Sequence, residues 1–195
     1  MHFKRLTEIV DPNTMTKTTH QFSWTAIITH WVIALAIFGL VVLGYWMVDL
    51  GYYDSWYVAA PALHKSIGLC LAAVMVFSVI WRLTKPRADP LPTHTYLERI
   101  LSQAMHLSLT LIIFLIIVSG YLISTGEGAG IEVFELFEVP ALGSFFENQE
   151  HNAGLIHKYA AYTIAVLVLF HTLAALKHHF VDQDATLRRM IGRKG

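Results

Sequence analysis

The segment Leu155–Leu176 has the sequence LIHKYAAYTIAVLVLFHTLAAL, and it decides the fold of the chain. Its length and apolar character predict an α-helix that crosses a hydrocarbon layer about 30 Å thick. Two histidines, His157 and His171, lie fourteen residues apart within it. In a helix both imidazoles then leave one face, about 40° apart around the axis and about 21 Å apart along it. Because a membrane-embedded histidine is costly and usually faces the bundle interior, this spacing predicts two stacked cofactor sites.

The composition is that of a membrane protein. Hydrophobic residues make up 55% of the 195 residues, charged residues 14%, and the mean hydropathy is +0.51. Each spanning segment should be helical, since a lipid-exposed chain must satisfy its own backbone hydrogen bonds. We therefore expect an all-α fold, an integral membrane four-helix up-down bundle. Its four spans are roughly Trp24–Met47, Ala62–Arg82, Leu101–Ile123 and Leu155–His178.

The distribution of Lys and Arg predicts the orientation. Of the 14 basic residues, only Lys65 and Lys158 fall outside the N-terminal segment, the second connection and the C-terminal segment. Cytoplasmic segments carry the excess of Lys and Arg, so both termini are expected in the cytoplasm of a bacterial cell. Residues 1–22 would form an N-terminal tail, 23–180 the membrane domain and 181–195 a basic C-terminal tail. The polar residues before Trp24 do not fit a secretory signal peptide.

The third connection, Ser124–Gly154, is long for a compact bundle, and long loops often carry a function. Residues 131–138 mix acidic with large apolar side chains, which suggests a short amphipathic element lying on the outer membrane surface. The connection contains six glutamates and no Lys or Arg. No repeat, nucleotide-binding loop or basic nucleic-acid-binding region is present, so no nucleic acid partner is expected.

The eleven histidines can be grouped by their expected depth in the membrane. His30 lies near the inner end of the first span and His64 near the outer end of the second. Because adjacent helices run antiparallel, His30 comes level with His171, and His64 comes level with His157. A single membrane-embedded histidine is often only a packed or hydrogen-bonded core residue. Two depth-matched pairs favour metal ligation.

Two imidazoles that face each other suit an iron porphyrin, whereas zinc and copper sites need three or four converging ligands. Small residues follow four positions after each candidate ligand, which gives a flat macrocycle clearance. Small residues are also common in membrane helices, so this supports the assignment without proving it. These residues are Ala34, Gly68, Ala161 and Ala175. With only Cys70 and no C-x-x-C-H motif, covalent haem attachment is excluded.

The remaining histidines and bases are weaker candidates. His106 and His178 lie toward the cytoplasmic side, where each is either a structural residue or a contact to quinone or a haem propionate. Three others are expected at the solvated surface: His2, His20 and His94. His151 is rejected as a ligand, because it lies on nearly the opposite helix face from His171. The candidate propionate partners are Lys65, Lys158, Arg82 and Arg99, although such charges often only set topology.

Several stretches resemble the bacterial cytochrome b561 family, and the likeness extends from Thr19 to Arg193. The histidines and their spacings match together, which makes the resemblance specific. Two further matches, Trp46-Met47 before Tyr52-Tyr53-Asp54 and Ser119–Thr125, resemble one branch of the family. The main stretches are Thr29–Trp31, Leu63–Gly68, Ala175–Phe180 and Asp184–Met190.

The resemblance implies a four-helix protein of the cytoplasmic membrane that holds two non-covalent haem b groups and exchanges electrons with ubiquinone. By position, its axial ligands are the set derived above: His30, His64, His157 and His171. It also implies a quinone site on the cytoplasmic side, where His178 is the matching residue. Relatives in the same branch can occur beside a small periplasmic isoprenoid-binding protein, which makes such a protein a candidate partner.

Three functions fit these features. The first is a two-haem conduit for electrons, because two axial imidazoles leave no open iron position and favour outer-sphere transfer. The second is superoxide:ubiquinone oxidoreductase, which some members of the family perform. The outer surface carries eight acidic residues and two basic ones, which disfavours steering of an anion. The third is a haem-bearing membrane anchor for a dehydrogenase or a periplasmic redox partner.

Overall fold

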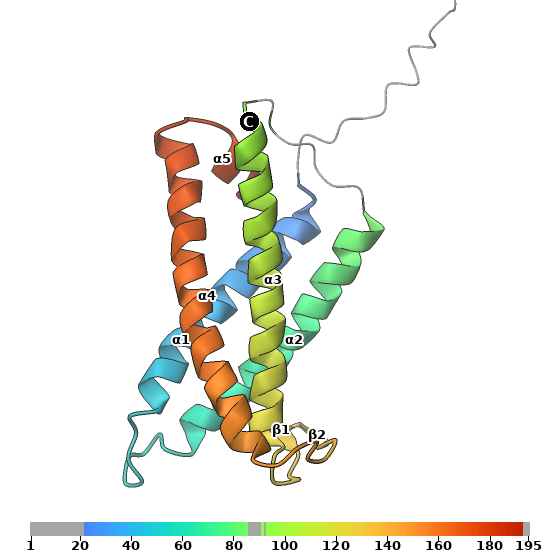
Figure 1. The fold of residues 1–195 in the computed structure, drawn as a ribbon, viewed down its shortest axis with the longest axis vertical. Coiled ribbons are helices and arrows are strands. Elements are labelled where there is room, and N and C mark those ends of the chain that lie inside the picture. The colour runs from blue at the N-terminus through green and yellow to red at the C-terminus, as the bar shows by residue number, and fades with distance from the viewer. Residues whose placement is uncertain (1–21, 86–90, 92, 193–195) are drawn as a thin grey trace, which may run out of the picture.

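The structure is a computed structural model that describes residues 22–85, 91 and 93–192. Its four long helices run alternately up and down and form one bundle (Figure 1). They are α1 (Trp24–Met47), α2 (Ala59–Thr84), α3 (Tyr96–Ser124) and α4 (Gln149–Phe180). A short helix, α5 (Thr186–Met190), covers one end of the bundle, which we call the α5 end. The strands β1 (Ile131–Val133) and β2 (Phe137–Val139) lie at the opposite end, which we call the hairpin end.

The predicted four-helix up-down bundle is confirmed. All four long helices are long and apolar enough to cross a membrane. The first has the predicted bounds, whereas the third begins earlier than expected, at Tyr96. The reason is a capping box: the Thr95 hydroxyl accepts a hydrogen bond from the Glu98 amide, and the Glu98 carboxylate accepts one from the Thr95 amide. This arrangement satisfies two amides that a helix start otherwise leaves free.

Helix α4 begins at Gln149 instead of near Leu155. The Gln149 side chain is buried and joins two other segments. Its amide nitrogen donates to the Leu122 carbonyl (3.0 Å), and its amide oxygen accepts from the Phe145 backbone (2.8 Å). The start of α4 is thereby fixed to the end of α3, which extends the helix beyond its apolar span.

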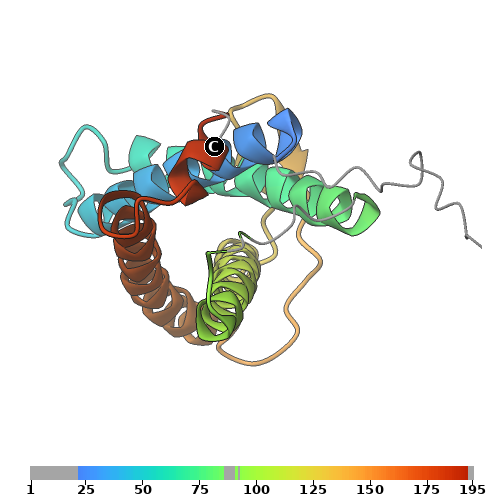
Figure 2. The ribbon, with the colours of Figure 1, turned by 90° about the horizontal axis from the view of Figure 1, so that it is seen from above.

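The helices pack as two pairs, α1 with α2 and α3 with α4 (Figure 2). Between 6% and 17% of the most apolar window of each helix is buried, so most apolar side chains point outward. An exposed apolar surface of this extent marks contact with lipid. The buried apolar core is small and lies midway along the bundle.

The third connection contains a short hairpin where an amphipathic element was expected. Strands β1 and β2 pair antiparallel with Ile131 opposite Val139. Ile131 and Val133 are buried, while Glu132 between them is exposed. The hairpin is fastened to α2 through Ser66, whose hydroxyl accepts a hydrogen bond from the Phe134 amide at 3.0 Å. Apolar residues at every second position fit a strand, and that period was visible in the sequence.

The C-terminal segment also differs from its expectation of a tail. It is folded as far as Gly192, with α5 beside the first part of α1 (Figure 2). The indole nitrogen of Trp31 donates to the Met190 carbonyl at 2.8 Å. The Arg189 guanidinium lies over the Phe22 ring, 5.0 Å from its centre. Residues 1–21 of the predicted N-terminal tail, and residues 86–90 and 92 of the second connection, lie outside the described residues.

Candidate functional site

Two histidines face each other near the hairpin end. The ring centres of His64 in α2 and His157 in α4 are 6.2 Å apart, and the ring planes are inclined by 70°. Both side chains are half-buried in the bundle. The structure therefore brings together one of the two predicted pairs.

Glycines of the other two helices border this pair. A Cβ atom added at Gly44 of α1 would lie 3.1 Å from Cε1 of His64. One added at Gly120 of α3 would lie 3.1 Å from Cε1 and 3.2 Å from Nδ1 of His157. Both contacts are tighter than ordinary van der Waals contact, so the rings occupy space that only a glycine leaves open. All four helices thus shape this site.

Hydrogen bonds orient the His157 ring. Its Nδ1 lies 2.9 Å from the Ile116 carbonyl and 3.3 Å from the Ser119 hydroxyl, both in α3. A carbonyl only accepts, so Nδ1 carries the proton and Nε2 keeps its lone pair for a metal. Metal-binding histidines usually have such a partner on the second nitrogen. In His64, by contrast, the buried Nδ1 has no hydrogen-bond partner among the described residues.

The second predicted pair lies toward the α5 end. The ring centres of His30 in α1 and His171 in α4 are also 6.2 Å apart, with planes inclined by 60°. A third imidazole borders this pair: the His106 ring of α3 lies 5.3 Å from that of His171. Its Nδ1 donates a hydrogen bond to the Ser102 carbonyl at 2.7 Å. His106 is therefore part of this site's wall.

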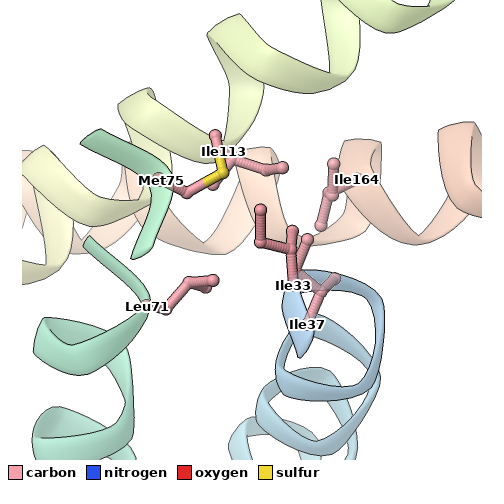
Figure 3. Close-up of a cluster of buried hydrophobic side chains, with 6 residues drawn as sticks. All are labelled: Ile33, Ile37, Leu71, Met75, Ile113 and Ile164. Carbon is pink, nitrogen blue, oxygen red and sulfur yellow. The ribbon is translucent and has the colours of Figure 1, made fainter. Parts of the chain in front are cut away.

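An apolar layer separates the two histidine pairs. Its side chains come from all four helices and point toward one another (Figure 3). Ile164 is almost fully buried and lies seven residues from both His157 and His171, so it is midway between the pairs. No charged side chain is part of the buried cluster. The cluster consists of Ile33, Ile37, Leu71, Met75, Ile113 and Ile164.

Both pairs fit a haem iron. Two metal–nitrogen bonds of about 2 Å on opposite sides of an ion separate the imidazole centres by about 6 Å. The observed 6.2 Å agrees at each site. One turn after His64, a Cβ atom at Gly68 would meet no atom within 4 Å, so the predicted clearance exists there.

The predicted basic residues are placed less closely. Lys65, Lys158 and Arg82 are exposed, and none contacts a histidine of the two pairs through a hydrogen bond in the described structure. Arg82 lies in the last turn of α2, toward the α5 end. Lys65 borders an open hollow of about 400 Å³ at the hairpin end, which is also lined by Met47, Tyr57, Val58, Pro61 and Ala62.

A polar cluster at the α5 end was not predicted. It joins His94, just before α3, to His178 near the end of α4 and to Asp184, just before α5. The Oδ2 atom of Asp184 lies 3.0 Å from Nε2 of His94 and 3.0 Å from Nδ1 of His178. Asp182 lies 2.9 Å from the same nitrogen of His178. His94 was expected at the solvated surface, but the fold leaves only 18% of its side chain exposed.

Asp184 is held in its charged form. Burial alone would raise the pKa of its carboxyl group, but hydrogen bonds from the Thr186 hydroxyl and amide outweigh that effect. The His94 hydrogen bond and the charge of His178 act in the same direction, so the net pKa is lowered. This carboxylate, 5% exposed, is therefore a negative charge that lies 3.0 Å from a nitrogen of each neighbouring imidazole.

No signal in the sequence connects His94 to this cluster. It is separated from Asp184 by 90 residues, and the two meet only because α3 and α5 start at the same end of the bundle. Gly44 and Gly120 were missed for a related reason. Each lies on a different helix from the histidine that it borders, and helix periodicity relates only residues of the same helix.

An interior with two facing histidine pairs, enclosed by four membrane-type helices, defines the site of a membrane-bound b-type cytochrome. The sequence profile of the prokaryotic cytochrome b561 family matches residues 21–193. The chain is 46% identical over 164 residues to "Cytochrome b561 homolog 2" of Escherichia coli (strain K12), across 84% of this chain and 87% of that protein. The chain belongs to the prokaryotic cytochrome b561 family. It is a multi-pass protein of the bacterial inner membrane, and the family points to electron transfer through b-type haem.

Proposed function

We propose that the chain carries electrons between two haem b groups and exchanges them with ubiquinone at the α5 end. The observation that supports this most directly is the recurrence of one geometry at two depths. Each pair has ring centres 6.2 Å apart, and α4 supplies one histidine to each pair. Bound haem supplies one-electron chemistry, and the chain holds it in place, orients it and excludes water.

In this proposal His64 and His157 are the axial ligands at the hairpin end, and His30 and His171 are those at the α5 end. Two protein ligands fill both axial positions, which favours outer-sphere electron transfer. The basic residues Lys65, Lys158 and Arg82 are the proposed propionate partners. They lie toward the membrane surfaces, where a carboxylate and a base can pair without full desolvation.

The α5 end is proposed to face the cytoplasm, because the basic residues of the described chain gather there and cytoplasmic segments carry the excess of Lys and Arg. The proposed quinone site is on this side. His178 is a half-buried imidazole two turns beyond His171, with carboxylates 2.9 Å and 3.0 Å from its Nδ1. His106, beside His171, is the second candidate contact. Both can exchange a proton with a quinone oxygen as it is reduced or oxidised.

The test is a count of haem per chain in variants of α4. His157→Ala removes the ligand at the hairpin end and His171→Ala the ligand at the α5 end, so each variant should retain one haem where the parent chain has two. His151→Ala is the matched control, because His151 lies on the same helix but is exposed. An unchanged haem-to-protein ratio in His157→Ala and His171→Ala would contradict the pairing. Loss of ubiquinol-driven haem reduction in His178→Ala, with both haems retained, would support the quinone site.

Oxidation of superoxide at the periplasmic face is the alternative function, and the charge of the hairpin end disfavours it. Glu132 and Glu138 are opposite each other in the hairpin, and further glutamates flank them. A negative surface slows the approach of an anion. The same surface suits a positively charged periplasmic redox or isoprenoid-binding partner. Reaction with superoxide near the diffusion limit that slows as salt increases would favour the alternative.

A further inference from the structure

The polar cluster at the α5 end has the composition of a metal site. Two imidazole nitrogens and one carboxylate oxygen converge from three separate segments: Nε2 of His94, Nδ1 of His178 and Oδ2 of Asp184. All three atoms lie within 4.8 Å of one another. Nitrogen and carboxylate ligands of this kind suit Zn²⁺ and related divalent transition metals. The cluster is distinct from the two histidine pairs in the membrane-spanning part of the bundle.

The distances fit a small tetrahedral ion. Two ligands bound at about 2.0 to 2.1 Å in tetrahedral geometry are about 3.3 Å apart. The Asp184 oxygen lies 3.0 Å from each imidazole nitrogen, so small rotations of the three side chains are sufficient to admit an ion. The two rings are already close, with centres 4.9 Å apart. The fourth position of a tetrahedral ion would be filled by water.

Hydrogen bonds favour an ion between these atoms over a purely hydrogen-bonded cluster. Nδ1 of His178 is buried and lies within 3.0 Å of two carboxylate oxygens, yet its geometry makes a hydrogen bond to neither. The other oxygen of Asp184 is fixed, because it accepts the Thr186 amide at 2.8 Å. Ligating carboxylates are commonly held in this way by a second hydrogen bond. Oδ2 is thus oriented toward both imidazoles.

A second group of possible ligands nearby is already occupied. Glu98, His178 and Asp182 also converge, but the Lys177 ammonium lies 3.2 Å from the Glu98 carboxylate and 2.7 Å from that of Asp182. A cation there would have to displace the lysine. The His94 cluster contains no such competing charge among the described residues.

We propose that His94, His178 and Asp184 bind one Zn²⁺ ion at the α5 end, with water as the fourth ligand. The ion links the start of α3, the end of α4 and the start of α5. This zinc site goes beyond the proposed electron transfer, because it would let an inorganic ion bind and affect the protein. Since it occupies His178, bound zinc also blocks the residue proposed to contact quinone.

The experiment is a Zn²⁺ titration of the haem-loaded protein in detergent, purified without a histidine tag, against a fluorescent zinc chelator. We expect one zinc ion per chain. Removal of a ligand should cost at least as much as loss of a second-shell partner, which lowers metal affinity about 10- to 100-fold. His94→Ala and Asp184→Asn should therefore each weaken binding by about a hundredfold or more. His151→Ala, an exposed histidine of α4, should bind zinc like the parent chain.

The haem absorbance of each variant shows whether the bundle remains folded, and His94→Gln replaces His94→Ala if the alanine variant loses haem. The inference is overturned if the parent chain binds no zinc, or if His94 variants bind it with unchanged affinity. The titration contains no quinone, so its outcome is independent of the proposed quinone site. Slower ubiquinol-driven haem reduction with zinc in the parent chain, but not in His94→Ala, would show that both assignments involve His178.

Discussion

The glycine beside His157 provides a sharp test of the hairpin-end site. In Gly120→Ala the new methyl group would lie 3.1 Å from Cε1 and 3.2 Å from Nδ1 of the ring. Carbon atoms prefer separations of about 3.5 to 4.0 Å, so the ring must retreat by roughly 0.4 Å or more. That movement also strains the 2.9 Å hydrogen bond from Nδ1 to the Ile116 carbonyl.

The magnitude follows from two opposing effects. Overpacking a well-filled interior costs about 1 to 3 kcal/mol, whereas replacing glycine by alanine inside a helix gains up to about 1 kcal/mol. Gly39→Ala in α1 is the matched control, since its added methyl group meets no atom within 4 Å. Gly39→Ala should gain helix stability from alanine without the cost of overpacking. The helix gain is the same with and without haem, so only the overpacking cost enters the haem affinity. Haem affinity at the hairpin-end site should therefore fall about 5- to 150-fold in Gly120→Ala, the range that 1 to 3 kcal/mol represents.

The assay is transfer of haem from the purified variants to an excess of apomyoglobin, followed by absorbance. One of the two haems should leave Gly120→Ala faster than the other, while Gly39→Ala should release both like the parent chain. Equal retention in the two variants would refute the argument that the His157 ring needs the space beside Gly120. Faster loss of both haems from Gly120→Ala would also refute it, because the strain is confined to one site.

Two further predictions concern the α5 end. Trp31→Phe removes the 2.8 Å hydrogen bond to the Met190 carbonyl, which is worth about 1 kcal/mol, so amide exchange in residues 186–190 should accelerate about fivefold. In the folded chain the pKa of Asp184 is lowered from its ordinary value of 3.8. The ionised carboxylate therefore stabilises the fold fully well above pH 4, and this contribution is lost as the pH falls through the lower pKa of the folded state. Between pH 6 and pH 3, thermal unfolding in detergent should shift less in Asp184→Asn than in the parent chain.

Controls distinguish these effects from general destabilisation. Trp46→Phe alters a tryptophan at the hairpin end and should leave exchange in residues 186–190 unchanged. Asp49→Asn removes a carboxylate at the same distant end, so its unfolding should follow the parent chain as the pH falls. Unaltered exchange in Trp31→Phe would mean that α5 is held by its other contacts, such as that of Arg189 with Phe22.

The parts of the molecule that could be predicted are those that a single helix determines. The spacing of His157 and His171 follows from helix geometry, and antiparallel neighbours then assign His30 and His64 to the same depths. The structure brings each of these pairs together at 6.2 Å. Four apolar segments of sufficient length likewise determine the number of helices.

The parts that were missed depend on contacts between segments. The β1–β2 hairpin is stable because Ser66 and the buried Ile131 and Val133 attach it to α2. A three-residue strand has no stability of its own, so its period of two was easily taken for an amphipathic surface element. The approach of His94 to His178 depends on how two distant loops meet, and no local pattern encodes it.

The apolar layer around Ile164 has an electrical consequence. Its six buried side chains are apolar and uncharged, so this cluster offers ions and protons no group to bind. In the proposed function an electron that moves between the pairs crosses about 21 Å of a hydrocarbon layer about 30 Å thick. It therefore traverses roughly 0.7 of the membrane voltage, which corresponds to about 1.6 kcal/mol per 100 mV. Each turnover would then either draw on the cell's transmembrane potential or contribute to it, according to the direction of flow.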